Sequence, residues 1–382
     1  MEQSSYYWLS LFIFLCSCYL LPWMLGHAGW YSLQPYRDIL LYIPTQQQFL
    51  LGPVIFYYTQ SLLNKSFRLH YRNCWHLLPA LLYLLYSLII FIADKLVLQQ
   101  YFFYANGRDK DLDTWYQVAG SISMTIYGML SLRYYSLYKK LLYQVTSFAD
   151  TLLFGWVKKY LMAFFLMQAI MFCLLVFYPQ WGSFTQKWWY YFLFGCMYYY
   201  IALTALTSNQ QSVIAFYTKQ LYNSPLYLVQ KSLLPLPRHS LPFNNDTLEV
   251  IAEPVSDLAT LHPELEKWRA VIIDLLVNQK MYEEPELTLS MLAEKAGTNI
   301  AVISKVVNQG FGQNFNDLVN SYRVKAIKQQ FIKGEHQHQT LLSIAYECGF
   351  NSKTTFNRVF KKMAGVSPKD FIKSAERTED NN

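Results

Sequence analysis

Long apolar runs alternate with short polar segments over the first 207 residues of the chain, a pattern typical of membrane-spanning helices. A helix needs about 20 largely apolar residues to cross the hydrocarbon core of a bilayer. The apolar runs cover residues 6–25, 38–63, 75–93, 115–138, 157–178 and 188–207. We expect the second run to be broken, because it contains Pro44, Gly52 and Pro53, and a break would make seven crossings instead of six. The pattern predicts a polytopic helical domain over residues 1–207.

The pattern changes at residue 208. Residues 208–263 contain six prolines, which interrupt long helices and indicate a linker, although 218–234 fits one short juxtamembrane helix. From residue 264 apolar positions recur at steps of three and four, which indicates amphipathic helices over 264–376. We expect residues 377–382 to form a disordered tail. The predicted fold class is therefore all-α, with a transmembrane helical domain and a second helical domain.

Basic residues assign the sides of the membrane. Positive charge concentrates in and beside residues 64–74 and 139–156, whereas alternate connections such as 94–114 balance their charges. Short loops rich in Lys and Arg remain cytoplasmic, so an even number of spans places both termini in the cytoplasm. We therefore predict a multi-pass protein of the inner (cytoplasmic) membrane with a cytoplasmic C-terminal domain.

The chain has a net charge of +7, and part of this excess of basic residues lies in the C-terminal domain. Residues 267–377 contain 16 Lys or Arg against 10 Asp or Glu. A basic domain joined to an apolar one suggests an anionic partner, with a solvated basic surface as the alternative explanation.

A helix-turn-helix pattern occurs twice in this domain. Residues 292–297 read LAEKAG, and residues 344–349 repeat the pattern as IAYECG, 52 positions later. The small Ala293 and Ala345 allow two helices to cross closely, and Gly297 and Gly349 permit a tight turn. DNA repeats about every 34 Å, so two such units suit a protein that reads successive turns of one duplex face.

Each unit continues into a helix that carries candidate DNA-contacting side chains. After Asn299, a good N-cap, the outward positions are Ala301, Val302, Ser304, Lys305 and Asn308. After Ser352 they are Lys353, Thr354, Asn357 and Arg358, followed by Lys361 and Lys362, which suit phosphates rather than bases. Alanine and valine can contact a thymine methyl group but cannot donate hydrogen bonds, so we expect the second unit to discriminate bases more strongly.

The apolar positions within residues 315–332 predict one continuous helix, which would connect the two units and fix their spacing. Arg323, Lys325 and Lys328 on this helix are further candidates for contacts to the DNA backbone.

The second unit and the connector resemble the AraC/XylS-type regulators. The resemblance rests on GFNS at 349–352, FNRVFKK at 356–362, GVSP at 365–368 and NSYRV at 320–324. It covers roughly residues 265–376 and implies a seven-helix domain that binds double-stranded promoter DNA and contacts RNA polymerase. The apolar half resembles the membrane-bound subgroup of these regulators less specifically.

We therefore expect a membrane-integral, sequence-specific transcription regulator that couples a membrane or envelope signal to promoter control. The alternative class is a polytopic transporter or membrane receptor that carries a regulatory helix-turn-helix tail. Transport usually needs ionisable groups inside the spans, and these spans have almost none, since Asp38 lies at an end. Two tails in one bilayer share a high effective concentration, which favours binding as a homodimer.

One polar cluster interrupts the second apolar run. It consists of Thr45, Gln46, Gln47 and Gln48, which we interpret as interhelical hydrogen bonding, with a ligand or signal site as the alternative. We expect no enzyme activity, metal or cofactor. The chain has no glycine-rich nucleotide loop, its histidines form no catalytic constellation and its cysteines form no CxxC pair.

Overall fold

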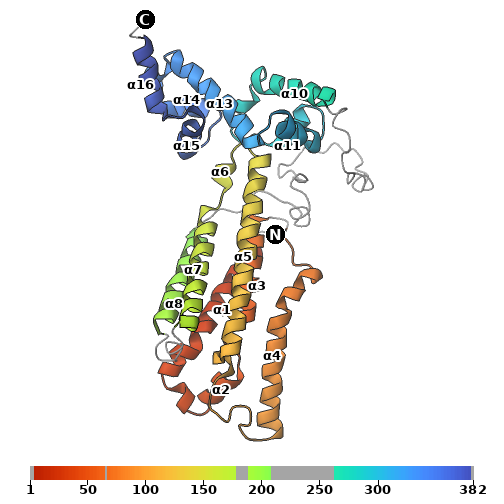
Figure 1. Ribbon diagram of the computed structural model, residues 1–382, viewed down its shortest axis with the longest axis vertical. Coiled ribbons are helices and arrows are strands. Elements are labelled where there is room, and N and C mark those ends of the chain that lie inside the picture. Colours follow the sequence, from red (N-terminus) through yellow and green to blue (C-terminus); the bar gives the residue numbers. More distant parts are fainter. Residues whose placement is uncertain (1–3, 65–66, 178–187, 208–261, 380–382) are drawn as a thin grey trace. The chain divides into compact units, whose positions relative to one another are not determined.

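A computed structural model describes residues 4–64, 67–177, 188–207 and 262–379 (Figure 1). Every regular element in these residues is a helix, which confirms the all-α class. Their contacts cluster into two units. The apolar unit contains the described residues up to 137 and from 154 to 207, and the C-terminal unit contains 138–153 and 262–379. The expected juxtamembrane helix and the expected linker up to residue 261 lie outside the described residues, and the next helix begins at His262.

Seven α-helices lie partly or wholly in the described residues of the apolar unit. They are α1 (Ser4–His27), α2 (Tyr36–Tyr42), α3 (Gln48–Leu63), α4 (Leu78–Phe91), α5 (Thr114–Val145), α7 (Gly155–Phe177) and α8 (Trp188–Thr207). A 3-10 helix, Tyr71–Leu77, precedes α4, and a π-helix, Ile92–Val97, follows it. The chain passes from the apolar unit to the C-terminal unit inside α5.

The second apolar run is broken, as expected. Helix α2 ends at Tyr42 and α3 begins at Gln48, with Ile43 in an extended conformation. Proline disfavours the helical conformation of the residue before it, so Pro44 accounts for the end of α2. Pro53 lies inside α3 and does not end that helix.

Three described segments are long and apolar enough to cross a membrane. They are Ser5–His27, Asn73–Val97 and Gly155–Cys173, which correspond to the first, third and fifth expected spans. Helix α3 has only 16 residues because of the break at Pro44. The count of six spans therefore stays a prediction.

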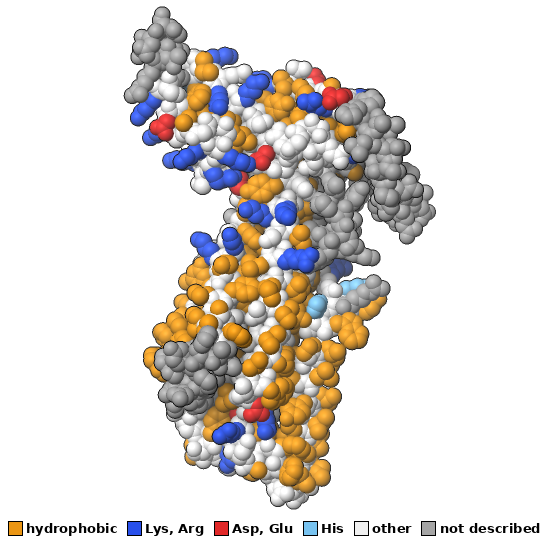
Figure 2. Space-filling model, viewed as in Figure 1, with side chains coloured by type: hydrophobic (Ala, Val, Ile, Leu, Met, Phe, Trp, Pro, Cys, Tyr) orange, Lys and Arg blue, Asp and Glu red, His pale blue; other side chains and the backbone are white. Residues whose placement is uncertain are grey.

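Helix α3 lies at the centre of the apolar unit. It packs against α1 and α4, and every residue from 51 to 60 is buried. Gly52 allows a close approach, since a Cβ there would lie 2.8 Å from Cδ2 of Tyr127. Helix α4 is different, because Leu81, Leu85 and Ile89 are exposed at steps of four residues along one face. Hydrophobic side chains cover much of the surface of this unit in Figure 2.

Residues 262–379 form seven α-helices, the number that the resemblance implied. They are α10 (His262–Val277), α11 (Leu289–Lys295), α12 (Ile300–Lys305), α13 (Phe315–Ile332), α14 (Leu341–Glu347), α15 (Lys353–Ala364) and α16 (Pro368–Glu379). Helix α16 continues past residue 376, so the first three residues of the expected tail are helical. The connector is one unbroken helix, α13, as predicted.

Helices α11 and α12 form the first helix-turn-helix unit, and α14 and α15 form the second. The turn glycines have positive φ angles, 70° at Gly297 and 88° at Gly349. Gly349 also lies against backbone, because a Cβ there would be 2.3 Å from the carbonyl oxygen of Tyr282. Asn299 caps α12 through the amide of Val302, as expected, whereas the side chain of Ser352 makes no cap hydrogen bond to α15.

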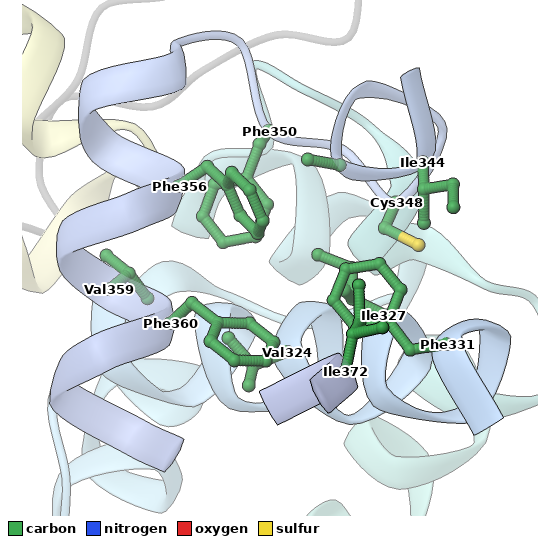
Figure 3. Packing of buried hydrophobic residues seen from close by; sticks show 11 residues of the cluster. Val324, Ile327, Phe331, Ile344, Cys348, Phe350, Phe356, Val359, Phe360 and Ile372 are labelled. Carbon is green, nitrogen blue, oxygen red and sulfur yellow. The ribbon is translucent and has the colours of Figure 1, made fainter. Parts of the chain in front are cut away.

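A hydrophobic core fixes the second unit onto the connector (Figure 3). Phe356 and Phe360 of α15 pack with ring centroids 5.8 Å apart, and Phe360 also contacts Phe331 of α13. Ile344 and Cys348 of α14 are buried in the same cluster. Burying one such aromatic side chain contributes about 1.5–3 kcal/mol, so this core holds α15 in a defined orientation.

Residues 138–153 cluster with the C-terminal unit, although we expected that domain to begin at residue 264. After α5 ends at Val145, Thr146 forms an isolated antiparallel bridge with Thr288. The amide of Ser147 donates to the carbonyl of Leu287 at 3.0 Å. A short helix, α6 (Ala149–Leu152), follows.

Candidate DNA interface

The polar face of α15 is the strongest candidate for a DNA-binding surface. All six residues expected to face outward from this helix are exposed: Lys353, Thr354, Asn357, Arg358, Lys361 and Lys362. Phe356, Val359 and Phe360 on the opposite face are buried. This separation follows from the 3.6-residue helical period. Helix α15 therefore presents a continuous polar and basic face.

Two cations on this face are paired with carboxylates. Arg358 donates from Nη2 to the carboxylate of Asp150, and Nζ of Lys362 lies 2.8 Å from Oδ1 of Asp317. The side chain of Arg358 is 48% exposed, and that of Asp150 is 13% exposed. Exposed ion pairs contribute only about 0–1 kcal/mol, so DNA phosphates can replace the carboxylates.

Helix α12 of the first unit differs from the helix expected there. Helix α12 has only six residues and continues into a π-helix, Val306–Gly310. Ser304, expected on the outward face, is 6% exposed. Asn308 folds back on it and donates its amide to the carbonyl of Ser304 at 2.8 Å. The π turn changes the helical spacing from Val306 onward, so it affects Asn308 but not Ser304, which lies within α12.

The remaining candidates in the first unit, Ala301, Val302 and Lys305, are half-buried. With Asn308 bonded to Ser304, this helix offers fewer free polar groups than α15 does. That difference agrees with the expected bias toward the second unit.

Arg323 does not lie on the surface, which corrects its assignment as a candidate DNA-backbone contact. It is 1% exposed, and its guanidinium donates to the carbonyls of Tyr282 at 2.8 Å and Glu284 at 2.6 Å. It also donates to Oγ of Ser147 at 3.1 Å. Burial lowers the pKa of Arg323 to about 9, so it remains charged at neutral pH. Among the other candidates on α13, Lys325 is exposed and Lys328 is half-buried.

Residues 146–150 also contribute to this region, and no sequence motif had indicated that they would. Thr146 accepts a hydrogen bond at its carbonyl from Asn316, 170 positions later in the chain. Ser147 bonds Arg323 across 176 positions. Such contacts are set by the tertiary fold, and the local pattern around 146–150 indicated only a polar loop.

The predicted polar cluster of the apolar unit forms interhelical hydrogen bonds. Gln46 is fully buried and donates from Nε2 to the carbonyl of Tyr19 in α1 at 3.1 Å. Its Oε1 accepts from Gln117 in α5 at 2.7 Å. The backbone amide of Gln48 donates to the hydroxyl of Tyr116. These contacts support the hydrogen-bonding interpretation.

The other two members lie in the segment between α2 and α3. Gln47 donates to the carbonyl of Pro44 at 2.6 Å, within the non-helical segment. Thr45 is half-buried in the same segment.

Two buried carboxylates lie beside this cluster, in a connection for which the sequence indicated only balanced charges. Asp111 accepts from the backbone amide of Gln46 at 2.9 Å and from the hydroxyl of Tyr83 at 2.6 Å. Asp109 accepts from the hydroxyl of Tyr31 at 2.6 Å. Burial, reinforced by the neighbouring charge of Asp111, raises the pKa of Asp109 to about 8. Burial also raises the pKa of Asp111.

A family model described as a helix-turn-helix domain matches residues 292–374, from α11 to α16. Curated relatives include uncharacterised HTH-type transcriptional regulators of Staphylococcus aureus strains COL, MSSA476 and N315. Each is 27% identical over 108 residues, which cover 27% of this chain and 14% of the relative. No solved structure matches the chain. The C-terminal part of the chain contains an AraC-type helix-turn-helix domain, like the DNA-binding domains of transcription regulators.

Proposed function

We propose that the chain is a membrane-integral, sequence-specific transcription regulator that binds promoter DNA chiefly through α15. The observation that carries the proposal is the exposed face of α15, where six polar or basic side chains lie on a helix fixed by a packed core. Arg358 and Asn357 suit guanine and adenine edges respectively, and Lys361 and Lys362 suit phosphates. Helix α12 supplies a second, less polar contact surface. RNA polymerase is the proposed partner at the promoter.

The apolar unit is proposed to anchor the protein in the cytoplasmic membrane by several spans. Three long apolar segments and the exposed leucine and isoleucine face of α4 support this placement. Residues 139–156 are basic at their borders and carry contacts of the DNA-binding unit. Both observations favour a cytoplasmic position for this connection.

A transporter or receptor would use buried ionisable groups, and the apolar unit has two buried carboxylates beside the polar cluster around Gln46. These carboxylates accept hydrogen bonds from protein donors, such as Tyr83 to Asp111, and these bonds give them a structural role. A regulator with a structural polar core in its apolar unit accounts for the same residues.

The proposal is tested with the full-length chain reconstituted in lipid nanodiscs and labelled genomic DNA fragments. We expect retardation of specific fragments, with affinity that falls steeply as salt rises, because cations displace counterions from phosphates. Asn357→Ala should reduce the preference among fragments. Lys333→Ala, which removes an exposed charge outside α15, is the control. Binding that is absent, or that does not respond to salt, would exclude the proposed function.

A further inference from the structure

A loop from the middle of the chain forms part of the C-terminal unit. We call residues 146–152 the docking loop; it joins α5 to α7, which begins at Gly155. Thr146 and Ser147 are each 1% exposed, and Ala149 is fully buried. The backbone amide of Ser147 donates to the carbonyl of Leu287, and the carbonyl of Thr146 accepts from the side-chain amide of Asn316.

The docking loop also completes the surroundings of a buried charge. Arg323 donates two hydrogen bonds to Ser147, one to the hydroxyl and one to the carbonyl. A buried guanidinium that loses its acceptors is strongly unfavourable. Displacing the whole loop is therefore costly, and its backbone contacts hold it in place.

One side chain of the loop reaches the reading helix. Asp150 accepts from the hydroxyl of Tyr143 at 2.6 Å through Oδ1 and from Arg358 through Oδ2. Tyr143 lies in the last turns of α5, so that helix orients the carboxylate. Asp150 comes from the separate segment 138–153, whereas Asp317, the partner of Lys362, lies on the connector helix α13.

We infer that the docking loop is an autoinhibitory element, in which Asp150 competes with DNA for Arg358. The inference rests on the proposed function of α15. While Asp150 is paired, Arg358 is occupied, and a carboxylate lies where DNA phosphates and base edges would approach. The competition is local, since the other polar residues of α15 stay exposed.

The covalent connection through α5 allows the apolar unit to control the competition between Asp150 and DNA. Helix α5 runs unbroken from Thr114 in the apolar unit to Val145, directly before the loop. A change in the register or rotation of α5 therefore acts on Tyr143 and Asp150 through the covalent chain. A change in the apolar unit thus affects Arg358 by keeping Asp150 paired with it or by moving Asp150 away.

The test compares full-length variants in nanodiscs, bound to a labelled duplex that the wild-type chain enriches from a random-sequence pool. Asp150→Asn should bind about threefold to fivefold more tightly, because an exposed ion pair contributes up to about 1 kcal/mol. Glu347→Gln removes one exposed negative charge from α14 and is the matched control. In an Arg358→Ala background, Asp150→Asn should give no gain.

Three outcomes would overturn the inference: unchanged or weaker binding by folded Asp150→Asn, an equal gain from Glu347→Gln, or a gain that persists without Arg358. Tyr143→Phe provides a second variant, since it removes the hydrogen bond that orients Asp150 and should shift affinity in the same direction. Wild-type binding without an effect of Asp150 would reject the inference alone. A wild-type chain that binds no duplex would reject the proposed function, and the inference with it.

Discussion

Arg323 donates a hydrogen bond from Nη2 to the side-chain hydroxyl of Ser147 at 3.1 Å, although the two residues are 176 positions apart. The same guanidinium bonds the carbonyls of Tyr282 and Glu284, in the segment before α11. One side chain of the connector helix thus joins three separate parts of the C-terminal unit. Its role is to hold the unit together, whereas α15 carries the surface proposed to contact DNA.

Replacing Arg323 with alanine should destabilise the C-terminal unit by about 3–5 kcal/mol, because several buried acceptors lose their charged donor. Hydrogen exchange of α13 amides in the full-length chain measures the loss. Lys325 is exposed and lies two residues further along the same helix, so Lys325→Ala should change stability by less than about 0.5 kcal/mol. Equal effects of the two changes would contradict the structural role of Arg323.

The two basic residues of α15 should differ in their effect on DNA binding. Arg358→Ala should cost about 1–3 kcal/mol at one base position and relax the preference there. Lys362→Ala should weaken binding to all sequences alike and reduce the salt slope by about one. Selection from random duplexes checks both. An unchanged selected motif for Arg358→Ala would remove this residue from base reading.

The buried carboxylates should make the stability of the apolar unit fall as pH rises. Asp109 has a folded-state pKa of about 8 against 3.8 for the free group, so the folded state binds the proton more tightly. The stabilising contribution is fully present below 3.8 and is lost as pH rises through about 8. Thermal unfolding of the full-length chain, measured from about pH 5 to about pH 9, tests this dependence.

Asp109→Asn is the matching variant for the pH measurement, because it removes the charge next to Asp111 and keeps the size of the side chain. It should flatten the pH dependence and raise stability at the alkaline end. The same slope in the variant and the wild type would assign the dependence to other groups.

Two turn glycines should respond very differently to alanine. Gly349→Ala places a Cβ 2.3 Å from the carbonyl oxygen of Tyr282 and 2.9 Å from Nε of Arg323, at a φ of 88°. We expect a loss of about 4 kcal/mol or more. Gly365→Ala has a similar φ of 79° but no atom within 4 Å, so backbone strain alone should cost about 1 kcal/mol. Hydrogen exchange of α15 amides compares the two.

Reporter fusions test the proposed membrane placement. A fusion at about residue 70 should report the cytoplasm, and one at about residue 105 the opposite side, because basic and neutral connections alternate. A cytoplasmic report from residue 105 would require the first four spans to be redrawn. A C-terminal fusion that reports the outside would exclude promoter binding altogether.

Features that depend on a few neighbouring residues could be predicted from the sequence. The break at Pro44, the cap at Asn299, the turn at Gly349 and the unbroken connector helix all follow from local backbone chemistry. The exposed face of α15 follows from helical periodicity. These features define the fold class and most of the candidate interface.

Features that depend on distant partners could not be predicted in this way. Arg323 has the composition of a surface residue on an amphipathic helix, and only the carbonyls around it explain its burial. Asp109 and Asp111 read as loop charges until Tyr31 and Tyr83 are placed beside them.

The docking loop has a consequence for how the protein is made. Its residues are synthesised well before Leu287 and Arg323, and they lie between two apolar helices. On the proposed membrane placement, the C-terminal unit can complete its fold only when the connection between α5 and α7 lies on the cytoplasmic side. A chain inserted in the wrong orientation leaves Arg323 without Ser147. Under that placement, correct insertion is a condition for the assembly of the unit proposed to bind DNA.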